Sequence, residues 1–127
     1  MTRVLVIDDE EIVRELVAEV LRRAGYDVLT AEAPDDARGH LDDPALALVL
    51  SDLVMPGLSG LELLDELRGR RHGLPVLLMT GAGTGGTTEI ALASGAAGLL
   101  RKPFSHSELR EAVAAALAGP SEPCGEA

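Results

Sequence analysis

Five short apolar runs recur along this chain of 127 residues, and each is followed by a polar or charged residue. The runs span residues 4–7, 28–31, 46–50, 76–79 and 98–100. Continuous apolar runs of this length indicate strands that are buried on both faces, as in a parallel sheet, because strands with one wet face alternate. Parallel neighbours need a crossover, usually a helix, between them. The chain is therefore expected to alternate strands with helices.

Helical patterns occupy the segments between these runs. Apolar residues repeat at helical spacing over 12–21, and a proline in the first position suits a second helix over 34–42. Capping boxes that begin at Ser59 and Ser105 predict two further helices. A short helix is expected over 87–94, between glycine-rich segments. The pattern thus contains five strands and five helices.

This alternation predicts an α/β fold, a doubly wound five-stranded parallel sheet in the order 2-1-3-4-5 with five helices. In such a sheet a site lies outside the carboxyl ends of the strands, at the point where the strand order reverses. Several polar residues stand at these ends, namely Asp8, Asp9, Asp52, Thr80 and Lys102. We expect these side chains to meet in one site.

The chemistry of this group indicates a cation site. Converging carboxylates repel one another unless a cation neutralises them. Oxygen ligands without His or Cys favour Mg²⁺ or Mn²⁺ over Zn²⁺. The neighbouring Glu10 is better explained as a solvated residue at a helix start. Lys102 is the single lysine among eleven Lys and Arg residues, and its compact charge suits a phosphoryl group or a buried carboxylate.

Composition narrows the class of partner. A formal net charge of −10 argues against direct nucleic-acid binding, and 2 % aromatic residues leave few platforms for stacking bases. Cys124 is the only cysteine, and no apolar run approaches the length of a membrane span. We expect a soluble cytoplasmic protein with protein partners and no membrane contact. The expected domain covers 1–118, and 119–127 is expected to be a disordered tail or the start of a linker.

Four short motifs occur in a fixed order. They are Val-Ile-Asp-Asp-Glu at 6–10, Ser-Asp-Leu-Val-Met-Pro-Gly at 51–57, Met-Thr-Gly at 79–81 and Arg-Lys-Pro-Phe at 101–104. Together they resemble the receiver domain of two-component response regulators, which has a flavodoxin-like fold, over residues 3 to about 118. The resemblance implies that Asp52 accepts a phosphoryl group from a histidine kinase or histidine phosphotransferase. The protein would then change conformation and signal to a downstream effector protein or a linked output domain.

The resemblance also implies roles for the site residues. Asp52 would be the nucleophile, and Lys102 and Thr80 would contact the phosphoryl group. The metal ligands would be Asp8, mainly through water, with Asp9, Asp52 and the backbone carbonyl of Val54. Backbone N–H groups would complete the phosphoryl-binding cradle, those of Leu53, Val54 and Gly81.

Other positions bear on switching and on the phosphoryl lifetime. Thr80 would move toward the phosphoryl group, and Leu99 stands where the family commonly places an aromatic residue that moves with it. Coupling to the surface formed by the fourth helix, the last strand and the last helix is therefore expected to differ, and a phosphorylation-dependent dimer is an open alternative. The peptide bond before Pro103 is expected to be cis. Val54 and Ala82 cannot orient an attacking water, which predicts slow self-dephosphorylation.

Two other functions compete with this interpretation. A Mg²⁺-dependent phosphohydrolase of the haloacid-dehalogenase-like kind also uses an Asp nucleophile, but places it on the first strand in an Asp-x-Asp motif. Here Asp8 and Asp9 are adjacent, and the lone Asp52 follows the third apolar run. A degenerate receiver that only binds proteins is disfavoured because all five site residues are present. The chain is thus expected to be a signalling phosphoacceptor and not an enzyme with turnover.

Overall fold

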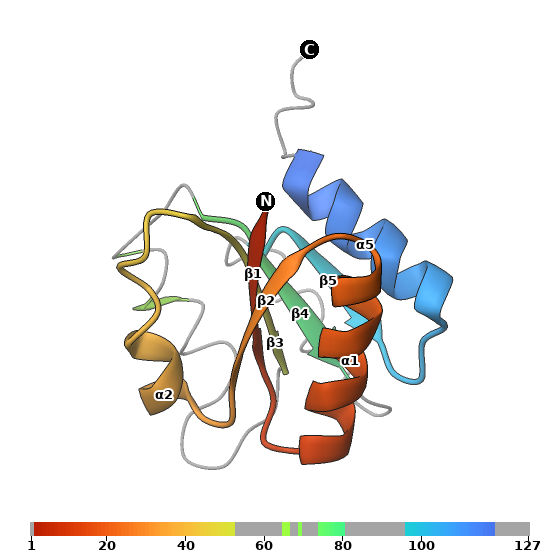
Figure 1. Ribbon diagram of the computed structural model, residues 1–127, viewed down its shortest axis with the longest axis horizontal. Coiled ribbons are helices and arrows are strands. Elements are labelled where there is room, and N and C mark those ends of the chain that lie inside the picture. The colour runs from red at the N-terminus through yellow and green to blue at the C-terminus, as the bar shows by residue number, and fades with distance from the viewer. Residues whose placement is uncertain (1, 53–64, 67–68, 70–73, 81–95, 119–127) are drawn as a thin grey trace.

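The computed structural model describes residues 2–52, 65–66, 69, 74–80 and 96–118 (Figure 1). The strands are β1 (Arg3–Ile7), β2 (Asp27–Ala31), β3 (Leu46–Asp52), β4 (Val76–Thr80) and β5 (Gly98–Arg101). The helices are α1 (Glu11–Arg23), α2 (Pro34–Arg38) and α5 (His106–Ala118). All five apolar runs of the sequence are strands, as predicted.

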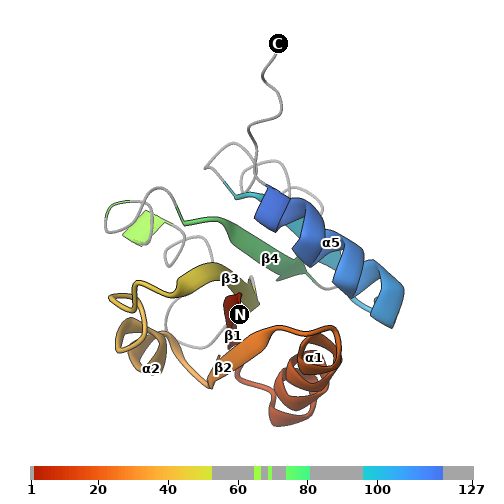
Figure 2. The ribbon, with the colours of Figure 1, turned by 45° about the horizontal axis from the view of Figure 1, so that its top comes forward.

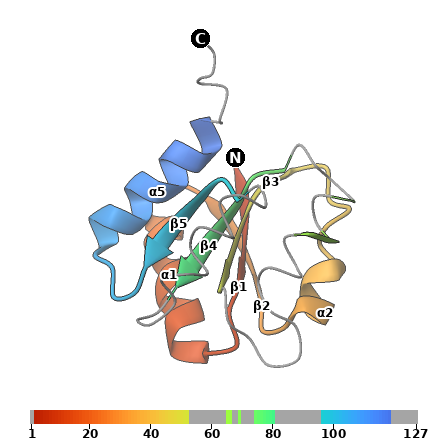
Figure 3. The ribbon, with the colours of Figure 1, turned by 180° about the vertical axis from the view of Figure 1, so that it is seen from behind.

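The strands form one parallel sheet in the order β2-β1-β3-β4-β5, which confirms the predicted topology. The register brings the strand ends to one edge: Ile7 pairs with Ser51, Asp52 with Met79, and Thr80 with Arg101. Seen from behind, β4 and β5 run side by side in the same direction (Figure 3). The carboxyl ends of β1, β3, β4 and β5 therefore share one edge of the sheet.

Two apolar cores cover the two faces of the sheet. Side chains of α1 and α5 pack on one face against alternate strand residues, such as Val6 and Leu50. Ala37 of α2 packs on the other face, with Ile7 and Val49. Figure 2 shows α1 and α5 on one side of the sheet and α2 on the other. Burial on both faces explains why the strands read as continuous apolar runs.

The first two helices begin near the predicted positions but differ in how they end. After α1, Gly25 adopts a φ of 101°, a conformation that favours glycine. The α2 helix ends at Arg38, whereas the sequence predicted an end near Asp42. Gly39 is its C-cap, and the next N–H groups bond three residues back, from His40 to the Ala37 carbonyl. The prediction was wrong here because a glycine in the last turn favours termination over continued α-helix.

The α5 helix has the capping box that was predicted. The Ser105 N–H donates to Glu108 Oε1 at 2.8 Å, and the Glu108 N–H donates to Ser105 Oγ at 3.0 Å. In the region of the predicted third helix, Asp65 and Glu66 are helical. The remainder of that helix, the helix predicted over 87–94 and the tail at 119–127 lie outside the described residues. In the described part of the chain, no helix has the length and apolar character needed to span a membrane.

Candidate functional site

The edge formed by the strand ends holds most of the polar residues that the sequence singled out. Asp8 directly follows β1, and its N–H donates to the Ala31 carbonyl at the end of β2 at 3.2 Å. Asp52 and Thr80 are the last residues of β3 and β4. Lys102 directly follows β5, and its N–H donates to the Thr80 carbonyl at 2.7 Å. Backbone hydrogen bonds between neighbouring strands thus bring these four residues to one edge.

The Lys102 ammonium lies between three carboxylates. Its Nζ is 3.3 Å from Asp52 Oδ2, 3.4 Å from Asp8 Oδ2 and 3.8 Å from Glu10 Oε1. Asp8 is fully buried and Asp52 is 8 % exposed, so two of these partners are withdrawn from water. The contact agrees with the sequence argument that a lone lysine serves a buried carboxylate or a phosphoryl group.

The pKa of Lys102 reflects opposing effects. Partial burial, the largest single effect, lowers the pKa of the ammonium. The charges of Asp52 and Asp8 and their hydrogen bonds to Nζ raise it, and together they prevail. The pKa of Lys102 is therefore raised above its ordinary value, and the side chain is a cation at neutral pH.

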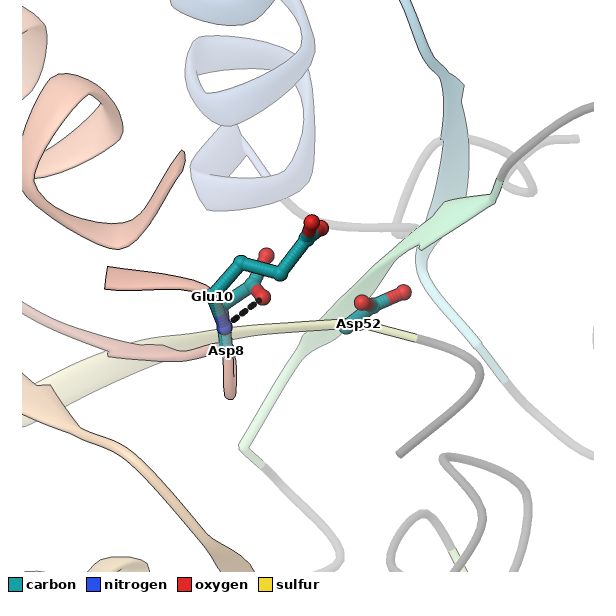
Figure 4. A group of neighbouring side chains, drawn as sticks. All are labelled: Asp8, Glu10 and Asp52. Carbon is teal, nitrogen blue, oxygen red and sulfur yellow. Dashed lines mark hydrogen bonds between the residues drawn. The ribbon is translucent and has the colours of Figure 1, made fainter. Parts of the chain in front are cut away.

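Three carboxylates form the acidic part of the site. Asp8, Glu10 and Asp52 each offer one oxygen, and these oxygens all lie within 4.8 Å of one another. Figure 4 shows Glu10 extending from the chain after Asp8, while Asp52 comes from β3. Hard divalent cations such as Mg²⁺ prefer oxygen ligands of this kind and retain several waters. One ammonium leaves two negative charges of this group unbalanced, so the donor set fits a divalent cation.

The acidic group differs in membership from the one expected. Asp9, a predicted metal ligand, is exposed and is not part of the three-carboxylate group of the described residues. Glu10, interpreted from sequence as a solvated helix-start residue, is exposed at the N-cap of α1, and one of its carboxylate oxygens also belongs to this group. Asp9 lies in a bend, and the Glu10 N–H donates to Asp8 Oδ1 at 2.9 Å, so Asp8 and Glu10 lie beside each other. No regular spacing in the sequence signals this contact, because it depends on the bend at residue 9.

Other positions that the sequence singled out lie close to this edge. Thr80 is buried, with 2 % of its surface exposed, at the end of β4. The Ser51 hydroxyl is fully buried and donates to the Asp52 carbonyl at 3.1 Å. Leu99, at the position where the family commonly has an aromatic residue, is partly buried against the core on the α2 face. The Lys102–Pro103 peptide bond is cis, as expected.

The backbone groups of Leu53, Val54 and Gly81, and the side chain of Ala82, lie outside the described residues. Their roles in metal binding, phosphoryl binding and phosphoryl lifetime stay predictions.

A family model and two curated relatives match most of this chain. The family model described as response regulator receiver domain matches residues 4–114. The uncharacterized transcriptional regulatory protein YrkP of Bacillus subtilis is 36 % identical over 115 residues, covering 91 % of this chain and 49 % of YrkP. The response regulator protein FleR of Pseudomonas aeruginosa is 37 % identical over 112 residues, covering 88 % of this chain and 24 % of FleR. The chain thus spans half the length or less of these curated relatives.

Solved structures show the same fold. A response regulator receiver domain protein from Clostridium thermocellum aligns with a TM-score of 0.88 and 30 % identity, covering 93 % of this chain and 95 % of that one. The receiver domain of NtrX from Brucella abortus aligns with a TM-score of 0.86 and 37 % identity, covering 91 % and 98 %. These alignments cover nearly the whole of both chains.

Proposed function

Because the chain belongs to the response regulator receiver domain family, we propose that Asp52 accepts a phosphoryl group from phosphohistidine on a histidine kinase or histidine phosphotransferase. The observation that carries this proposal is the pairing of Asp52 with Lys102 at 3.3 Å, beside the Asp8 and Glu10 carboxylates. A buried carboxylate held by a single cation and surrounded by further carboxylates is typical of a site prepared for metal and phosphoryl chemistry.

The transfer step follows from these groups. An Asp52 carboxylate oxygen attacks phosphorus, the phosphorus–nitrogen bond of the donor breaks, and the imidazole leaves with the bonding electron pair. The product is an aspartyl phosphate. The Lys102 ammonium contacts Asp52 beforehand and would pair with a phosphoryl oxygen afterwards. The Thr80 hydroxyl would donate to another phosphoryl oxygen.

We assign the acidic group to Mg²⁺ or Mn²⁺. Asp8 and Asp52 would hold the ion together with Asp9 and the Val54 carbonyl, as the family resemblance implies. Glu10 supplies a third carboxylate within 4.8 Å of those of Asp8 and Asp52. A bound divalent cation supplies positive charge that neutralises the carboxylates and the developing charge on the phosphoryl oxygens.

The output of this domain is a further part of the proposal. Phosphorylation would draw Thr80 toward the phosphoryl group and alter the surface near β5 and α5, with Leu99 in place of the family's aromatic residue. The relatives are longer than this chain, so the proposed partner is a downstream effector protein or a linked output domain. The proposed receiver covers 1–118. Direct nucleic-acid contact by the receiver is disfavoured by its charge of −10.

Intact-mass measurement tests the proposal. The protein is incubated with acetyl phosphate, with and without Mg²⁺, alongside Asp52→Asn and the control Asp36→Asn, which removes an exposed carboxylate in α2. We expect one Mg²⁺-dependent phosphoryl adduct on the wild type and the control, and none on Asp52→Asn. A folded wild type without an adduct would favour a protein-binding module. Rapid, repeated hydrolysis of acetyl phosphate would favour the phosphohydrolase.

A further inference from the structure

Arg14 of α1 is an arginine on a surface helix whose side chain is largely withdrawn from water. Its side chain is 13 % exposed, and its Nη1 donates to the Asp8 carbonyl at 2.9 Å. Arginine is rarely buried unless it has a partner. The bond to the Asp8 carbonyl is such a partner for the Arg14 guanidinium. The acceptor belongs to the residue whose carboxylate contacts Lys102.

The contact closes a ring of hydrogen bonds around the acidic segment. The Glu10 N–H donates to Asp8 Oδ1 at 2.9 Å, the bond drawn in Figure 4. The Arg14 N–H donates to the Glu10 carbonyl at 2.9 Å, and the Arg14 guanidinium returns to the Asp8 carbonyl. These bonds restrain the backbone on both sides of residue 9. They also orient the Asp8 carboxylate, and they direct Glu10 to the side of the site.

The charge of Arg14 alone would have the opposite effect on cation binding. A guanidinium bonded to the Asp8 carbonyl adds positive charge close to the carboxylates, and its ion pair with the exposed Glu15, at 3.8 Å, offsets this only in part. Removing the charge would by itself strengthen the binding of a cation. Removing the hydrogen bond would release the segment that carries the ligands. The two effects have opposite signs and can therefore be separated.

We propose that Arg14 is a positioning residue that holds the Asp8–Glu10 segment in the conformation that binds the divalent cation. This inference rests on the proposed function, because it concerns the metal of the same site. Groups that orient metal ligands by hydrogen bonds change metal affinity by about 10–100-fold when they are removed. Here the restraint acts on the backbone of a ligand residue, and it outweighs the favourable loss of a positive charge.

Mn²⁺ affinity, measured by electron paramagnetic resonance of the free ion, tests this inference without phosphorylation. Arg14→Met is expected to bind Mn²⁺ about tenfold more weakly than the wild type. Arg14→Lys retains the charge and one donor group and is expected to recover part of that loss. The matched control is Arg22→Met, because Arg22 lies on the same helix and its Nη2 donates to the Val28 carbonyl at 3.3 Å, in the strand β2. The control is expected to bind Mn²⁺ as the wild type does.

A second readout separates positioning from catalysis. The Mg²⁺ concentration that gives half-maximal phosphorylation by acetyl phosphate is expected to rise about tenfold in Arg14→Met. The maximal rate at saturating Mg²⁺ is expected to match the wild type, because Asp52, Thr80 and Lys102 are retained. Equal or tighter Mn²⁺ binding by folded Arg14→Met, or the same loss in Arg22→Met, would overturn the inference.

Unfolding curves recorded by circular dichroism show whether each variant is folded. If Arg14→Met does not fold, Arg14→Lys is compared with Arg22→Lys: weaker Mn²⁺ binding only in the former supports the inference, and equal binding overturns it. A wild type that binds Mn²⁺ but forms no phosphoryl adduct would refute the proposed function. The affinity comparison would still decide the role of Arg14.

Discussion

Asp52→Asn is expected to stabilise the metal-free protein, although it removes an ion pair. At an effective dielectric constant of about 20, the attraction between Asp52 and Lys102 at 3.3 Å amounts to about 5 kcal/mol. The repulsion between the Asp52 and Asp8 carboxylates, whose oxygens lie within 4.8 Å, is about 3.5 kcal/mol or more. Withdrawing the charge of Asp52 from water costs several kcal/mol in addition.

The sum of these effects favours a neutral residue at position 52. Asparagine keeps an oxygen that can accept from Lys102, and it removes both the repulsion and the desolvation of a charge. We expect the free energy of unfolding to rise by about 1–3 kcal/mol in the absence of divalent cations. Mg²⁺ should reduce this difference, because a ligand at 100 times its Kd stabilises the wild type by about 2.7 kcal/mol. The variant, which lacks one ligand, should gain less.

Urea unfolding followed by circular dichroism, in EDTA and in excess MgCl₂, measures both parts of this prediction. Glu111→Gln is the control, because it removes one negative charge from an exposed position of α5 and is expected to change stability by no more than about 0.5 kcal/mol. An Asp52→Asn protein that is less stable than the wild type in EDTA would refute the reasoning. So would a difference that Mg²⁺ leaves unchanged.

Three further predictions concern the fold and the charge of the lysine. Gly25→Ala should lower the free energy of unfolding by about 1–2 kcal/mol, because Gly25 has a φ of 101°. No atom lies within 4 Å of an added Cβ there, so the cost comes from the backbone conformation alone. Gly39→Ala, at a φ of −65°, should be neutral or slightly stabilising in the same urea titration. Leu21→Ala should destabilise by about 2–5 kcal/mol because Leu21 is fully buried, and Leu16→Ala on the same helix, where Leu16 is 51 % exposed, should cost much less. The pKa of Lys102 is raised in the folded protein. Its ion pairs therefore stabilise the fold fully below the pKa of an unfolded lysine, about 10.4, and this stabilisation is lost only as the pH rises through the higher folded value. As the single lysine, its ¹³Cε resonance can be titrated directly, and a midpoint at or below the ordinary value would contradict this.

Much of the fold could be predicted from local patterns. The apolar runs predicted the five strands because burial on both faces leaves no alternating polar positions. The strand order followed from the short right-handed crossovers that connect parallel strands. The capping box at Ser105 and Glu108 predicted the start of α5 because both hydrogen bonds are made within one helical turn. The end of α2 was predicted too late, near Asp42, because the low helix propensity of Gly39 ends the helix at Arg38.

The site shows which part of the protein the sequence by itself determined. The residue types at the strand ends, and the rule that parallel strands end at one edge, were sufficient to bring Asp8, Asp52 and Lys102 together. Only the tertiary structure decided that Glu10, rather than Asp9, joins Asp8 and Asp52 in the three-carboxylate group of the described residues, and that Arg14 bonds to the Asp8 carbonyl. The physical reason is that the positions of the strand ends are set by the register of the parallel strands, in which the same backbone hydrogen bonds repeat from residue to residue. The direction of a side chain in a turn depends on individual hydrogen bonds and on charges as distant in sequence as Lys102, 94 residues from Asp8.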